Sequence, residues 1–228
     1  MEKETLTIGS RPCISYYDPD PEMLLIQPSS GDEEGFLDMQ VRRIEELSSR
    51  SFILVSFHID DWNKELSPWP APPVFGDEGF GDGAKETLAY VTGELIPYVK
   101  SRYGLKDDIP VVLGGYSLAG LFSLWSMYET GLFYAVCGVS PSVWFEGWDE
   151  YQSSHSPGSS KVYLSLGKKE EKTKNPVMSR VGDRIRKLEE VLRKSDADCI
   201  LEWNEGGHFN DPGDRCAKGF IWCLNNED

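Results

Sequence analysis

Short apolar runs alternate along this chain with longer segments in which apolar residues recur every three to four positions. Short, nearly continuous apolar runs are typical of strands buried on both faces, and the longer periodic segments are typical of helices that cover a sheet. Six strands of this kind are predicted, at residues 23–27, 52–57, 109–113, 135–139, 161–166 and 199–203. Residues 6–8 and 13–17 are expected to add antiparallel edge strands at the start of the chain.

Five helices are predicted between and after these strands. Residues 35–48 and 83–103 carry apolar stripes at helical spacing, and Pro97 predicts a kink in the second segment because it removes a backbone donor. A third helix should begin directly after Ser117. A fourth is marked by Ile185, Leu188, Val191 and Leu192, and a short fifth by Phe220, Ile221 and Leu224. This alternation predicts a mostly parallel, three-layer α/β sheet with helices on both faces, in a single domain over residues 1–228.

Residues 60–82 show neither helical nor strand periodicity and are rich in Pro, Gly and aromatic residues. They predict a long surface loop. Because long loops inside a domain are often functional, we expect this one to have a role in binding or access.

Charge and cysteine content narrow the possible partners and location. The chain has 23 Lys and Arg against 38 Asp and Glu, for a net charge of -15, which repels nucleic acid and anionic membranes. No apolar stretch approaches the ~20 residues of a membrane helix, and residues 1–11 lack the apolar core of a signal peptide. Five cysteines without C-x-x-C spacing predict reduced thiols. We therefore expect a cytoplasmic protein with neither a nucleic-acid nor a membrane partner.

The segment over residues 111–121, VVLGGYSLAGL, is typical of a strand that runs through a tight turn into a helix. A serine that projects from such a turn needs small residues two positions before and after it, and Gly115 and Ala119 meet this need around Ser117. The Leu118 amide would begin the helix, where a free N–H and the helix dipole stabilise an oxyanion. Ala119 departs mildly from the usual G-x-S-x-G pattern.

A nucleophilic serine needs a base and an orienting acid, and where the serine stands on a strand-to-helix elbow they follow it along the chain in the order acid, then histidine. Of three histidines, His208 is the best candidate base, because it lies in a Gly-rich loop after the last predicted strand. His58 ends a strand and His155 lies in a polar turn. Glu170 follows a strand and a glycine and is the preferred acid, with the adjacent Glu171 as the alternative.

With these residues the chain resembles the putative esterases of the α/β hydrolase superfamily, which include siderophore esterases, feruloyl esterases and esterase D. The resemblance covers roughly residues 83–208. Its motifs are GELIPYVKSRYG (93–104), GGYSLAGLFSLW (114–125), YAVCGVSPSVWF (134–145), YLSLGKKEE (163–171) and GGHF (206–209).

The resemblance implies the α/β hydrolase fold and cleavage of a small-molecule carboxylic ester, of siderophore type or aromatic, through an acyl-enzyme. Ser117 would be the nucleophile, His208 the base and Glu170 the acid, and no metal or cofactor is implied. Two alternatives stay open: acyl transfer to an alcohol on the same fold, and a non-catalytic binding module.

The start of the site fits the family less well. Relatives often carry Asp-Gly or His-Gly after the first core strand, where this chain has QPSS at residues 27–30, so the second oxyanion donor is expected to be Ser29 or Ser30. Aromatic residues near the elbow and in the long loop are expected to form the wall of a substrate pocket. They are Tyr116, Trp144, Phe145 and Trp148, with Trp62 and Trp69 from the loop.

Overall fold

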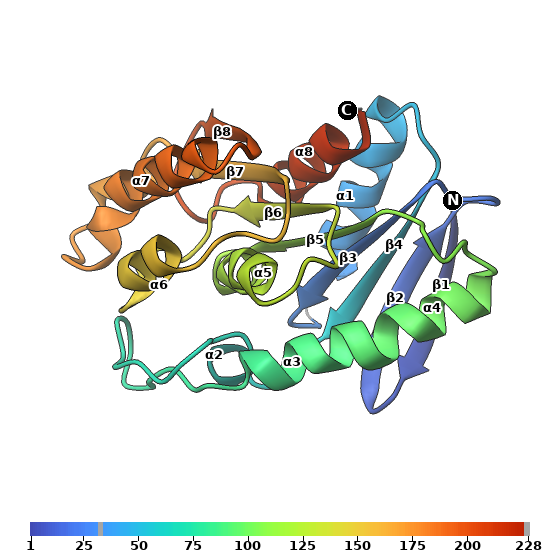
Figure 1. Cartoon of the computed structure of the whole chain (residues 1–228), viewed down its shortest axis with the longest axis horizontal. Coiled ribbons are helices and arrows are strands. Elements are labelled where there is room, and N and C mark those ends of the chain that lie inside the picture. The colour runs from blue at the N-terminus through green and yellow to red at the C-terminus, as the bar shows by residue number, and fades with distance from the viewer. Residues whose placement is uncertain (32–33, 226–228) are drawn as a thin grey trace.

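One eight-stranded sheet forms the centre of the protein, whose computed structural model describes residues 1–31 and 34–225 (Figure 1). Its order is β1-β2-β4-β3-β5-β6-β7-β8. The edge strand β1 is antiparallel to β2, β2 is antiparallel to β4, and the six strands β3 to β8 are parallel to one another. The strands are β1 (Glu2–Ile8), β2 (Arg11–Tyr17), β3 (Met23–Ser29), β4 (Phe52–His58), β5 (Val111–Tyr116), β6 (Ala135–Val139), β7 (Lys161–Gly167) and β8 (Asp198–Asn204). All eight predicted strands are confirmed, most of them longer at one or both ends than the apolar runs.

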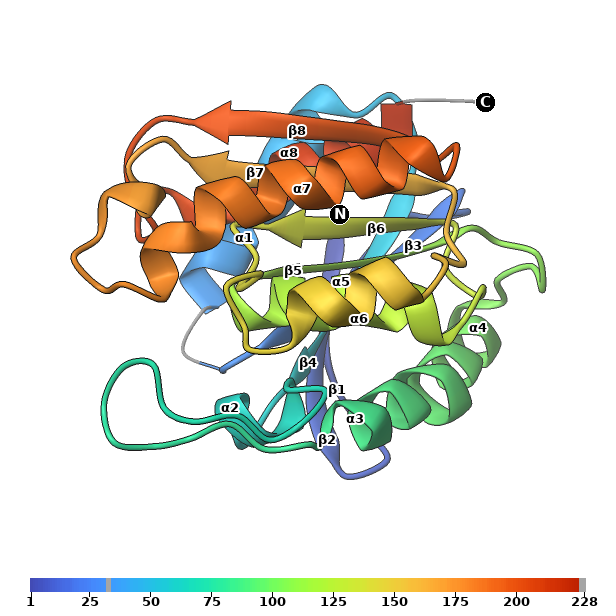
Figure 2. The same cartoon turned by 60° about the vertical axis from the view of Figure 1, so that its left-hand side comes forward.

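Helices cover both faces of the sheet, as Figures 1 and 2 show. One face carries α1 (Glu34–Leu47) and α8 (Pro212–Asn225), whose apolar residues share one core cluster. The other face carries α3 (Ala84–Tyr90), α4 (Ile96–Tyr103), α5 (Leu118–Glu129), α6 (Trp148–Ser154) and α7 (Val181–Lys194), which pack in a second cluster. The predicted three-layer α/β architecture is confirmed. None of the helices within the described residues is both long and apolar enough to span a membrane.

The helices differ from the prediction in several places. The C-terminal helix α8 is 14 residues long rather than short, because Gly213, Arg215 and Gly219 lie on its buried face and interrupt the apolar stripe. Helix α6 was not predicted.

Pro97 is accommodated by a change of helix type. It lies at the second position of α4 inside a continuous helical stretch, and the turn before it, η1 (Val91–Leu95), is π-helical, so the wider turn accommodates the residue that lacks a donor. Helix α4 then ends at Gly104, whose φ of 64° is the left-handed conformation of a common helix terminator.

The order of the strands fixes where a site can form. The chain passes from β3 through α1 to β4 on one side, and later enters β5 on the other side of β3. Loops that leave β3 and β5 therefore diverge, and a crevice forms at the carboxyl ends of these two strands. The long segment at residues 60–82 holds the short helix α2 (Trp62–Glu65) and an isolated bridge between Ala71 and Phe80.

Candidate active site

Ser117 occupies a strained turn between β5 and α5. Its φ of 59° and ψ of -120° are unusual for a residue with a side chain. Backbone hydrogen bonds hold it there: its N–H donates to Val139 O at 3.0 Å, and its carbonyl accepts from the N–H of Ser142 at 3.0 Å. A Cβ on Gly115 would lie 2.5 Å from the Ala119 backbone, so the turn requires glycine at that position. The methyl group of Ala119 fits.

His208 lies within hydrogen-bonding distance of this serine. Its Nε2 is 3.0 Å from Ser117 Oγ, although the two residues are 91 positions apart. The loop that carries it follows β8, and Gly207 N donates to Asn210 Oδ1 at 2.7 Å, which closes the loop on itself. Tyr116 OH also donates to the His208 carbonyl. Burial raises the pKa of Tyr116 to about 12, so its hydroxyl stays protonated as this donor.

Glu170 contacts the other nitrogen of the imidazole. Its Oε2 is 2.8 Å from His208 Nδ1, and its Oε1 accepts from Ser140 Oγ at 2.8 Å and from Gly167 N at 2.7 Å. Burial acts to raise the pKa of this carboxyl, but the hydrogen bond to His208, the charge of the imidazole and the other donors outweigh it, and the pKa is lowered. Glu171 points elsewhere, to Arg186 at 3.1 Å. Of the two candidate acids, Glu170 is therefore the one that contacts the histidine.

Arg215, on α8, is a residue of the site that the sequence did not predict. Its side chain is only 2% exposed and forms an ion pair with Glu170 Oε1 at 3.0 Å. Its other guanidinium nitrogen donates to the carbonyls of Glu205 at 2.8 Å and Gly207 at 3.0 Å, in the loop that carries His208. Nothing in the periodicity distinguishes this arginine from the other basic residues.

The residues expected to supply oxyanion donors differ in their surroundings. The Leu118 N–H is at the first position of α5, where no intrahelical acceptor exists. Of the two serines after the first core strand, Ser29 is tied to the neighbouring strand, since its carbonyl accepts from Ile59 N at 2.9 Å and its Oγ approaches Phe57 O at 3.5 Å. Ser30 instead lines the cavity that contains Ser117.

That cavity has a volume of about 610 Å³ and lies on the α1 and α8 side of the sheet. It is mostly apolar, and Trp62 and Tyr116 are among its lining residues. The other lining residues are Gln27, Pro28, Ser30, Phe36, Leu37, Gln40, Gly115, Ser117, His208, Phe209, Pro212, Gly213 and Cys216.

Trp144 and Phe145 do not line this cavity. Both are buried in the core on the α5 side, where their rings pack on Phe80 at centroid distances of 5.9 and 5.1 Å. The segment after β6 turns toward that face, and sequence proximity to the elbow could not reveal the direction. Trp148 is buried in the same core.

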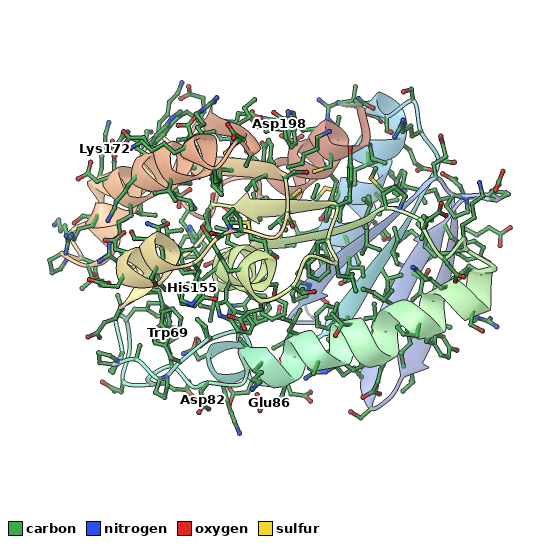
Figure 3. The ribbon with its side chains drawn as sticks, viewed as in Figure 1. Trp69, Asp82, Glu86, His155, Lys172 and Asp198 are labelled. Carbon is green, nitrogen blue, oxygen red and sulfur yellow. The ribbon has the colours of Figure 1, made fainter. Side chains whose placement is uncertain are left out.

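Trp69 also packs against the core that contains Trp144, Phe145 and Trp148, and does not line the cavity. It lies between the long loop and α6 (Figure 3), 5.2 Å from the Tyr151 ring, and its indole donates to Glu146 O at 2.7 Å. The loop therefore contributes Trp62 to the cavity and anchors itself through Trp69.

The remaining histidines lie outside the hydrogen-bonded group. His58 Nε2 is 3.2 Å from Asp60, and His155 is exposed and stacks on Tyr151 at 4.1 Å (Figure 3). Across the part of the chain that the structure describes, no three His, Cys, Asp or Glu side chains are grouped as metal ligands.

The fold and the elbow are those of the α/β hydrolases. Within that class, the family model described as "Putative esterase" matches residues 29–201, which is more than half of the chain. The chain therefore belongs to the putative esterase family.

Individual comparisons agree with the family. The chain is 26% identical over 163 residues to the uncharacterised protein YbbA of Bacillus subtilis, covering 68% of this chain but only 62% of YbbA. An IroE-like serine hydrolase from Shewanella oneidensis has the same fold, with a TM-score of 0.81, 16% identity and coverage of 100% of this chain and 82% of its own. The siderophore hydrolase EstB from Aspergillus nidulans superimposes with a TM-score of 0.76 and 16% identity, covering 98% of this chain and 94% of its own.

Proposed function

We propose that the protein hydrolyses a small-molecule carboxylic ester through an acyl-enzyme on Ser117. The observation that carries this proposal is the unbroken series of hydrogen bonds from Ser117 Oγ through His208 to Glu170, with the serine at the wall of an apolar cavity.

In the first step, His208 Nε2 takes the Ser117 proton as Oγ attacks the ester carbonyl, and the imidazolium then gives that proton to the leaving alcohol. In the second step, His208 takes a proton from water, whose oxygen attacks the acyl carbonyl. The bond between the acyl carbon and Ser117 Oγ then breaks, the imidazolium returns the proton to Oγ, and the carboxylic acid leaves. Glu170 stabilises the imidazolium and holds its tautomer, and its lowered pKa keeps it ionised for this role.

The negative oxygen that forms in each step needs donors. We assign the first to Leu118 N–H at the start of α5, and the second to the backbone N–H of Ser30 rather than Ser29, because only Ser30 of the two lines the cavity. Each donor of this kind contributes on the order of 3 kcal/mol to transition-state stabilisation.

Aromatic or apolar esters are the substrate type that the cavity supports best, since Trp62, Tyr116, Phe36 and Phe209 all line it. A siderophore-type ester is the second candidate, on the basis of the shared fold with EstB, which is described as a siderophore hydrolase.

A fluorophosphonate probe together with para-nitrophenyl esters tests the proposal. We expect a single adduct at Ser117, ester turnover in the wild type, and neither in Ser117→Ala. Ser126→Ala is the matched control, because it removes a buried serine of the same helix whose hydroxyl only donates to Phe122 O. Its labelling should be unchanged. If the folded wild-type protein takes up no probe, it is a binding module and not an enzyme. If the acyl group is transferred to added alcohols in preference to water, the protein is an acyltransferase.

A further inference from the structure

The cavity beside Ser117 has no lining residue with a permanent charge. Among the residues that the structure describes, its 15 lining residues include no Lys, Arg, Asp or Glu. The polar floor is made of two amides: Gln27 is 7% and Gln40 is 2% exposed, and Gln40 Nε2 donates to Gln27 Oε1 at 2.7 Å. Any hydrogen bond that these amides offer to a bound group is therefore a neutral one.

The charged side chains next to the cavity are mostly carboxylates, and two of these carboxylates are paired with cations: Asp38 with Lys3 at 3.0 Å and Asp214 with Arg43 at 3.4 Å. The charged residues directly next to lining residues along the chain are four carboxylates and one guanidinium: Asp38, Asp61, Asp211, Asp214 and Arg215. The guanidinium is buried and engaged with Glu170, so it offers no positive charge to the cavity. The whole chain adds a net charge of -15.

From these observations we infer that the cavity binds an uncharged, apolar part of the ester and discriminates against esters that carry a carboxylate on that part. A carboxylate inside would lose its hydration without meeting a lining Lys or Arg, and on approach it would be repelled by a chain whose net charge is -15. This inference rests on the proposed esterase function and names its substrate class.

Matched ester pairs test it on the wild-type protein. In the acyl part, para-nitrophenyl hexanoate is compared with the para-nitrophenyl monoester of adipic acid, in which a carboxylate replaces the terminal methyl group. In the alcohol part, phenyl acetate is compared with para-carboxyphenyl acetate. In at least one pair, kcat/KM of the anionic member should be lower by about tenfold or more, mostly through KM. Added salt should reduce this difference, because it screens the repulsion while the neutral ester has no charge to screen.

A charge added at the cavity gives a second, independent readout. Phe36 lines the cavity and is 48% exposed, so Phe36→Lys places a cation there at low cost to folding. It should raise kcat/KM for the anionic ester several-fold. Leu132→Lys is the control, since Leu132 is similarly exposed, at 42%, but lies before the amino end of β6, at the opposite end of the parallel strands. It should leave the discrimination unchanged.

The possible outcomes distinguish a failure of the proposed substrate class from a failure of the proposed esterase function. If neutral esters are hydrolysed and both members of each pair react equally at low salt, the substrate class is wrong and the esterase function stands. The same holds if Phe36→Lys and Leu132→Lys have equal effects. If neutral esters are not hydrolysed and Ser117 takes up no probe, the proposed function itself is wrong and this inference is lost with it.

Discussion

Replacing Arg215 by methionine removes a buried cation from beneath the proposed catalytic acid while keeping a side chain of similar length. The guanidinium contacts Glu170 Oε1, Ser140 Oγ and the carbonyls of Glu205 and Gly207, and both members of its ion pair are at most 5% exposed. Methionine leaves Glu170 charged and buried without its cation. It also leaves two carbonyls of the His208 loop without their donor.

The size of the effect follows from this burial. Breaking a buried ion pair on one side costs about 3–5 kcal/mol, and we expect the free energy of unfolding to fall by that amount near neutral pH. Exposed pairs contribute about 1 kcal/mol or less, so Arg43→Met, which removes a half-exposed pair with Asp214, should have a much smaller effect. Urea denaturation measures both, with the midpoint shifted and the slope unchanged.

A double-mutant cycle locates the cause. Once Glu170 is replaced by glutamine, no charge is left for Arg215 to compensate. The double variant Arg215→Met, Glu170→Gln should therefore be clearly more stable than the sum of the single effects predicts. The stabilising role of this ion pair is refuted if the free energy of unfolding of Arg215→Met is within about 1 kcal/mol of the wild-type value. It is also refuted if the effects of the two substitutions simply add.

Three further predictions concern the same site. His208→Ala should lower kcat for a neutral ester by on the order of 10⁴-fold, measured in the same ester assay, because the base is lost while the cavity remains; a loss below about tenfold would contradict its role. Because the pKa of Glu170 is lowered in the folded protein, it stabilises the fold above its ordinary unfolded value of about 4.3, and this contribution is lost as pH falls through the folded pKa. Stability against pH below about 5, followed by circular dichroism, should therefore fall less steeply in Glu170→Gln than in the wild type, and parallel curves would argue against the shift. Gly115→Ala should destabilise the elbow by about 2 kcal/mol or more, since its methyl would overlap the Ala119 backbone, whereas Gly93→Ala, in open space on a helix, should not destabilise in thermal melts.

The strands and the elbow could be predicted from sequence because their signals are local. Parallel strands buried on both faces leave continuous apolar runs, and the crowding at the turn demands small residues at positions 115 and 119. Chain order, together with the positions of His208 and Glu170 after predicted strands and next to glycines, pointed to these two residues. It could not separate Glu170 from Glu171, since their side chains differ only in the direction that a 3-10 turn, η2 (Glu170–Lys172), gives them.

Other features depend on contacts between distant segments. Trp144 and Phe145 were expected at the pocket wall, but the sheet has two faces and nothing local says which one the segment after β6 joins. The burial of Arg215 could not be predicted either, because a buried arginine in a helix is recognisable only once its partner, here Glu170, is known. The cytoplasmic location and the single domain stay predictions.

The three groups of the proposed catalytic series come from the ends of β5, β7 and β8, three strands of which two are adjacent and the third lies one strand away. No fragment of the sheet can bring them within reach, since the nucleophile and base are 91 residues apart and the supporting arginine comes later still, on the final helix. Under the proposed mechanism, turnover therefore requires the sheet through β8 and the loop after it, and a nascent chain whose residue 208 is still inside the ribosome would lack its base.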